Sequence, residues 1–247
     1  SETQMLSSPN PIRLLTVIGC SLALIAVTPA CEDDSSSSSS AGTSSGPATA
    51  TIDAVVAQYS AIVHANYLDS HRAAVVLDDS IAAFLADPTE ASLTAAKDAW
   101  KSSREPYLQT EVFRFYDGPI DNPTDGPEGL LNAWPMDESH VDYTVDKPNG
   151  GIVNETSLVL TEQALLDLNE VPDETNIATG YHAVEFLLWG QDLSADSAGT
   201  RPATDYVTDG TGTAANQGRR GEYLSIASGL IVKHLEPLVA AWDPSGS

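Results

Sequence analysis

Residues 179–192 read TGYHAVEFLLWGQD, and the rest of the chain is interpreted around this stretch. Val184, Leu187 and Leu188 recur at the spacing of a single apolar helical stripe. The pattern therefore predicts a helix that packs its apolar side against other helices. Gly180, near the start of the stretch, has no side chain and would let a neighbouring helix approach closely.

His182 and Glu185 are three residues apart in this stretch. On a helix this spacing places the two Cβ atoms about 5–6 Å apart on one face. An imidazole nitrogen and a carboxylate oxygen can then converge on one cation, as in the metal sites of helix bundles. A solvated or internally hydrogen-bonded pair is the ordinary alternative. Because the surrounding residues are apolar, the pair is expected to be partly buried and to need a partner.

The composition describes an acidic globular protein. The chain has 247 residues, of which 42% are hydrophobic, enough for one or two domains with a core. Its net charge of −24 argues against nucleic acid as a partner, suits an extracytoplasmic protein and favours cations as ligands. Its two cysteines, Cys20 and Cys31, both precede the predicted folded body, which therefore has no thiolate or disulfide available.

The N-terminal segment 1–31 is predicted to be a signal peptide. Arg13 precedes an apolar run at 14–27 that is shorter than the roughly 20 residues a bilayer requires. The run ends in TPAC, which resembles a bacterial lipobox with Cys31 as the lipidated residue. An ordinary cleaved signal is the alternative. Residues 32–50 are Ser-rich and are predicted to form a disordered tether.

Residues 51–247 are predicted to form one all-α domain, a helical bundle of the four-helix type with long irregular loops. Apolar residues at helical spacing predict helices at 51–86, from about 89 to 116 with a kink at Pro106, at 155–168, around His182, and at 219–242. Gly and Pro recur throughout 117–154, which is expected to be a long irregular loop that is either functional or disordered.

Further carboxylates could join the pair formed by His182 and Glu185. Glu111 is the acid of the second helix most suited to face inward, either as a ligand or in a salt bridge to Arg104 or Arg114. The loop segment 134–143 contains aromatic and apolar residues that would pack it onto the body. It carries Asp137, Glu138, His140 and Asp142, and one or more of these acids could complete a hard-cation site or remain solvated.

The chain resembles the imelysin-like family, in particular its iron-regulated-protein branch. The residues that carry the resemblance are GYHAVE at 180–185, which matches the family pattern G-x-H-x-x-E, and four further segments in the same order along the chain. These segments are EVFRF at 111–115, DGPID at 117–121, WPMDE at 134–138 and RRGEYL at 219–224. The resemblance implies an all-α bundle in an extracytoplasmic, often membrane-anchored bacterial protein associated with iron acquisition.

The resemblance also implies the ligand set. The His and Glu of the family pattern are its proposed metal ligands, so His182 and Glu185 are the first candidates here, followed by Glu111 and Asp137. Iron or another divalent metal is the expected cofactor. Family members usually continue into a second helical bundle, so this chain is expected to be truncated before it.

Three functions are compared. The first is a lipid-anchored metal-binding protein of the bacterial cell envelope, in the periplasm or at the cell surface, that works with an iron-uptake partner protein. The second is a zinc-type metallopeptidase, which is disfavoured because the chain has no H-E-x-x-H and because Glu185, used as a ligand, leaves no evident base. The third is a surface interaction module that needs no metal.

Overall fold

The computed structural model describes residues 51–245, and within this range the chain is helical and contains no strand. This confirms the predicted all-α class. The predicted signal peptide, Cys31 and the Ser-rich tether lie outside the described residues. The elements are, in chain order, α1 (Ile52–Ala86), α2 (Glu90–Gln109), η1 (Thr110–Phe113), α3 (Glu128–Asn132), α4 (Glu138–Val141), α5 (Glu162–Leu168), α6 (Gly180–Trp189), η2 (Ala203–Tyr206) and α7 (Gln217–Ala241).

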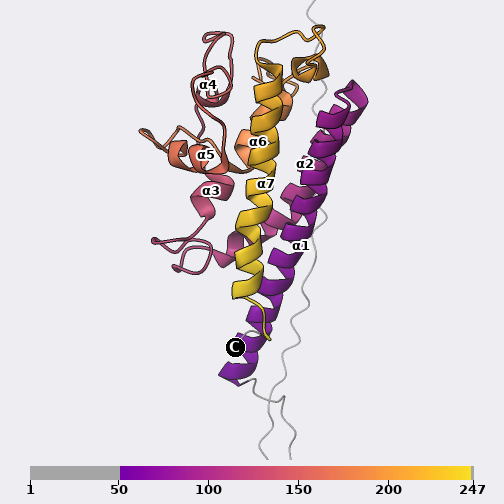
Figure 1. Cartoon of the computed structure of the whole chain (residues 1–247). Coiled ribbons are helices and arrows are strands. Elements are labelled where there is room, and N and C mark those ends of the chain that lie inside the picture. Colours follow the sequence, from indigo (N-terminus) through magenta and orange to yellow (C-terminus); the bar gives the residue numbers. More distant parts are fainter. Residues whose placement is uncertain (1–50, 246–247) are drawn as a thin grey trace, which may run out of the picture. The chain divides into compact units, whose positions relative to one another are not determined.

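Helices α1, α2, α6 and α7 form the bundle (Figure 1). Helix α1 packs along α2 and α7, and α6 packs against α7 and α2. The short helices α3, α4 and α5 lie on the side of α7 opposite α1 and α2 (Figure 1). Because α3 and α4 both contact α6, the irregular region is packed onto the helix that carries His182.

The starts of the two longest N-terminal helices follow local capping chemistry. The Thr51 side chain accepts a hydrogen bond from the Ala54 amide and begins α1. Thr89 and Ser92 form a reciprocal capping box at the start of α2, directly after the break at Pro88. Such caps satisfy amides that have no partner within the helix. The predicted helix break and helix start are therefore confirmed.

The second helix is shorter than predicted. It continues past Pro106 but ends at Gln109 and is followed by the 3-10 turn η1, whereas the sequence pattern predicted helix to about Tyr116. Phe115 has a φ of 73°, in the left-handed region, so the helix cannot extend through it. The Asp121 carboxylate accepts a hydrogen bond from the Phe115 amide and holds this turn in place.

The predicted start of the third helix at Glu155 is wrong, because α5 begins only at Glu162. The reason lies far away in the sequence, at the start of α7. The Arg219 guanidinium donates hydrogen bonds to four backbone carbonyls between residues 152 and 158, at 2.9–3.1 Å. Carbonyls bound in this way hold the segment in turns. The Thr161 side chain then caps α5 by accepting from the Ala164 amide.

Helix α7 contains a long apolar stretch. With 25 residues and one strongly apolar 18-residue stretch, it has the length and composition of a candidate membrane span. Its fully buried side chains, among them Tyr223, Leu230 and Leu235, belong to the same core as those of α1 and α6. A helix that packs on several sides within a bundle carries the same pattern.

Candidate functional site

Gly180 fixes the position of α6. Its φ is +80°, and a Cβ placed on it would lie 2.5 Å from the Leu131 carbonyl oxygen at the end of α3. Only glycine tolerates both the backbone conformation and this approach. The close approach expected from the sequence is thereby confirmed. It brings the end of α3, and the loop that follows it, directly against the first turn of α6.

The N-terminus of α6 is held by side chains from other elements. The side-chain oxygen Oδ1 of the buried Asn169 accepts hydrogen bonds from the backbone amides of Ala178 and Thr179, at 2.8 and 3.1 Å. Tyr223 of α7 donates its hydroxyl to the Ala178 carbonyl at 2.8 Å. Leu187 and Leu188 are fully buried, and each contributes about 1.5–3 kcal/mol of hydrophobic stabilisation. The helix that presents His182 is therefore rigidly placed.

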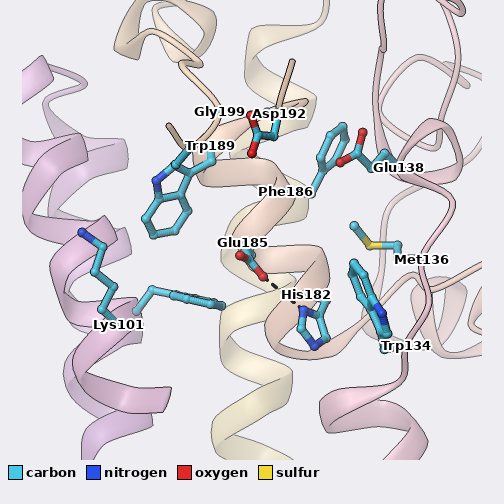
Figure 2. A pocket seen from close by; sticks show the side chains of 13 residues that line it. Lys101, Trp134, Met136, Glu138, His182, Glu185, Phe186, Trp189, Asp192 and Gly199 are labelled. Carbon is cyan, nitrogen blue, oxygen red and sulfur yellow. Dashed lines mark hydrogen bonds and ion pairs between the residues drawn. The ribbon is translucent and has the colours of Figure 1, made fainter. Parts of the chain in front are cut away.

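His182 and Glu185 meet on one face of α6, as their spacing predicts. His182 Nδ1 lies 3.1 Å from Glu185 Oε2, and the two side chains are 17% and 42% exposed (Figure 2). The Trp134 ring lies against the imidazole, with ring centroids 4.8 Å apart. The imidazole is thus sheltered on one side, while the carboxylate remains open to solvent and to a ligand.

The pair lines a pocket of about 360 Å³. Two more carboxylates, those of Glu138 and Asp192, line the same pocket, and both are drawn on its upper side in Figure 2. Glu138 begins the short helix α4, and Asp192 follows the end of α6. Burial, and then the charges of Asp192, Asp137 and Glu185, raise the pKa of Glu138. The pocket therefore gathers negative charge from three separate segments.

Glu111 lies elsewhere and does not line this pocket. Its carboxylate pairs with Arg114 at 2.9 Å, and Arg114 also pairs with Glu128 at 3.0 Å. The Asn132 amide lies 3.4 Å from the same Glu111 carboxylate. Of the two interpretations of Glu111, the structure shows the salt bridge to Arg114.

Asp137 is also occupied and does not line the pocket. It caps α4 by accepting hydrogen bonds from the amide and the hydroxyl of Ser139, at 2.9 and 2.6 Å. The hydrogen bonds from Ser139 lower the pKa of Asp137. The next residue, Glu138, points to the pocket instead. Within residues 51–245 no group of three or more His, Cys, Asp or Glu side chains is close enough to hold a metal ion.

Glu138 and Asp192, the two further carboxylates of the pocket, were not among the predicted ligands, although the sequence contained weak signals for both. Glu138 stood among the four candidate side chains of the loop segment, and Asp192 closes the stretch 179–192. Choosing Glu138 over Asp137 required knowing that α4 starts at this point, since a helix takes the preceding acid as its cap.

A buried cluster of charges lies close to the pocket. Asp142 accepts a hydrogen bond from the guanidinium group of Arg220 at 2.7 Å and forms an ion pair with that of Arg201 at 2.8 Å. The Arg201 guanidinium lies over the ring of Phe186, which lines the pocket, with its central carbon 5.6 Å from the centroid. Asp142 follows α4 directly, and its amide donates to the Glu138 carbonyl at 3.3 Å. The cluster therefore fixes the element that carries Glu138.

The comparisons with known proteins define the class. A protein-family model described as Imelysin matches residues 63–247, so the chain belongs to the imelysin family. Among curated proteins, the chain is similar to Iron-regulated protein A of Synechococcus elongatus, with 27% identity over 128 residues. The matched region covers 52% of this chain and only 29% of that relative's length.

Proposed function

We propose that this protein binds iron or another divalent metal ion in the bacterial cell envelope, as part of iron uptake, with His182 and Glu185 as the first ligands. The observation that carries the proposal is the 3.1 Å contact between the imidazole and the carboxylate, inside a pocket that further acids line. The similarity to Iron-regulated protein A and membership of the imelysin family support an association with iron.

The donor types that line the pocket suit such an ion. An imidazole nitrogen combined with carboxylate oxygens suits divalent iron, manganese or zinc. Glu138 and Asp192 line the same pocket and are the natural sources of further oxygen donors. We place them ahead of Glu111 and Asp137, because a ligand role for either of these would require its present salt bridge or helix cap to open. The net charge of −24 raises the local concentration of cations.

Metal binding is tested by anaerobic equilibrium dialysis of the purified protein against Fe²⁺ and, separately, Zn²⁺. His182→Ala and Glu185→Gln are expected to weaken binding by about tenfold or more, since even outer partners of metal ligands have effects of this size. His71→Ala removes an imidazole of α1 that does not line the pocket and serves as the matched control. Unchanged binding in both pocket variants would contradict the proposal.

The same samples distinguish binding from catalysis. Peptide hydrolysis that requires the added metal and is lost in Glu185→Gln would favour the metallopeptidase alternative. Metal binding without hydrolysis is the expected result.

Anchoring at Cys31 is the second part of the proposal and is tested separately. The full chain, expressed in a bacterium with labelled palmitate, is expected to carry the label and to sediment with membranes. Cys31→Ala should lose both properties, while Cys20→Ala, at the other cysteine of the chain, should keep them. A labelled, membrane-bound Cys31→Ala variant would rule out this anchor.

A further inference from the structure

The pocket beside His182 has aromatic walls. Three of the chain's four tryptophans line it, namely Trp100, Trp134 and Trp189. The rings of Trp100 and Trp189 meet edge to face, with centroids 5.3 Å apart. In Figure 2 Trp134 stands across the pocket from Trp189, with His182 and Glu185 between them. Trp134 is 67% exposed, so its ring is accessible from solvent while it also lies against the imidazole of His182.

The same pocket carries an excess of negative charge, which would attract a cation. Three carboxylates line it, those of Glu138, Glu185 and Asp192, against one ammonium group, that of Lys101. The carboxylates come from α4, from α6 and from the segment after α6. Their combination with aromatic walls differs from a simple acidic surface, because the rings shape an apolar cavity around the charges.

One tryptophan of the pocket already attracts ammonium groups within the protein. Lys97 Nζ and Lys101 Nζ lie 5.5 and 5.9 Å from the ring centroid of Trp189. Both distances fall within the range of cation–π attraction, for which tryptophan is the best ring. Lys101 also lines the pocket, so it is an internal competitor for any cation that enters from solvent.

We propose that this pocket binds a small organic cation, an alkylammonium group with an apolar body. The tryptophan rings contact the apolar body and attract the charge, and Glu138, Glu185 and Asp192 neutralise it. The volume of about 360 Å³ lies within the range of small-molecule pockets. The proposal requires no metal ion and goes beyond the metal-binding function.

The test is a fluorescence titration of the purified protein in EDTA at constant ionic strength. Choline is the probe, and 3,3-dimethylbutan-1-ol, its uncharged counterpart of the same shape, is the control. Choline is expected to change the tryptophan emission saturably and to bind about tenfold or more tightly than the alcohol. Equal affinity for the two, or no saturable response to choline, would overturn the proposal.

Variants test the assigned roles. Trp134→Leu and Glu138→Gln are each expected to weaken choline binding by about fivefold or more, whereas Lys101→Gln should tighten it because it removes the competing ammonium group. Trp242→Phe, which alters the tryptophan outside the pocket, should leave the affinity unchanged. Circular dichroism melts verify that each variant is folded. Weaker binding in Lys101→Gln, or unchanged affinity in both pocket variants, would contradict the proposal.

The outcomes are separable from those of the metal experiment. Because EDTA removes the metal ions, a failure to bind choline leaves the dialysis result with Fe²⁺ or Zn²⁺ untouched. Choline binding with no metal uptake would retain this inference and reject the metal-binding function.

Discussion

Arg220 Nε lies 2.7 Å from Asp142 Oδ2, and both side chains are completely buried although 78 residues separate them in the sequence. The same carboxylate pairs with Arg201 at 2.8 Å, and Arg201 reaches Asp205 at 3.3 Å. Two arginines thus balance two aspartates. Pairing with an opposite charge offsets the cost of burying each of these groups. The cluster ties α7 to the end of α4 and to the segment around η2.

Arg220→Met tests the cluster. The change leaves the Asp142 carboxylate with one guanidinium fewer, and breaking a buried pair in this manner costs about 3–5 kcal/mol. Urea denaturation should show that loss in the free energy of unfolding. Lys233→Met breaks an exposed ion pair to Glu162 and is the matched control, with an expected change of about 1 kcal/mol or less. Similar losses of unfolding free energy in the two variants would show that burial does not determine how much the cluster contributes to stability.

Gly180→Ala tests the close packing of α6 against the end of α3. The new methyl group would meet the Leu131 carbonyl at 2.5 Å and would force a left-handed backbone on alanine, so a loss of about 2 kcal/mol or more is expected. Gly229→Ala is the control, because a Cβ there has open space and lies within helix α7. It should be neutral or stabilise by up to about 1 kcal/mol. Thermal melts measure the stability of both variants, and equal melting temperatures would contradict the close contact between Gly180 and the Leu131 carbonyl.

Two half-buried histidines make stability depend on pH. Burial lowers the pKa of His140 and of His234, and Nε2 of each is buried without a hydrogen-bond partner. Below the ordinary pKa of about 6.5 the unfolded chain therefore binds more protons than the folded one. The free energy of unfolding should fall as the pH drops through this range. The double variant His140→Gln, His234→Gln should flatten that fall in urea titrations at several pH values; an unchanged slope would exclude the two histidines as its source.

Glu138→Gln separates stability from ligand binding. The pKa of Glu138 is raised, so its ionisation is penalised in the folded state and stability falls as the pH rises above the ordinary glutamate range. The variant should melt about 1–2 °C higher than wild type at pH 7, with the gain vanishing near pH 4. It should also bind cations more weakly. A lower melting temperature at pH 7 would show that the carboxylate stabilises its surroundings instead.

Local sequence signals predicted much of the fold. The apolar spacing identified the long helices, and the expected boundary between 86 and 89 agrees with the end of α1 and the start of α2. Gly180 anticipated a close helix contact, which the Leu131 carbonyl supplies. The helices and their boundaries depend on residues within a few positions of one another, and such short-range patterns are visible in a single sequence. The glycine indicated a close approach but not its partner, which lies 49 residues away.

Features set by distant residues could not be predicted in the same way. The late start of α5 depends on Arg219, which binds carbonyls more than 60 residues away. Glu111 had two open interpretations because its sequence neighbours offered both an inward face and an arginine. The use of Asp137 as a helix cap, and hence the approach of Glu138 to the pocket, follows from where the chain turns into α4.

The Asp142 amide bonds to the Glu138 carbonyl, and the Asp142 carboxylate pairs with Arg220 in the core. The buried ion pairs and the pocket residue Glu138 are therefore held by the same short segment. A ligand that rests on Glu138 will therefore slow the opening of α4, and amide hydrogen exchange in that helix will report occupancy. For the same reason, a substitution that weakens the ion pairs of Asp142 is expected to lower the affinity of the pocket for its ligand before it unfolds the bundle.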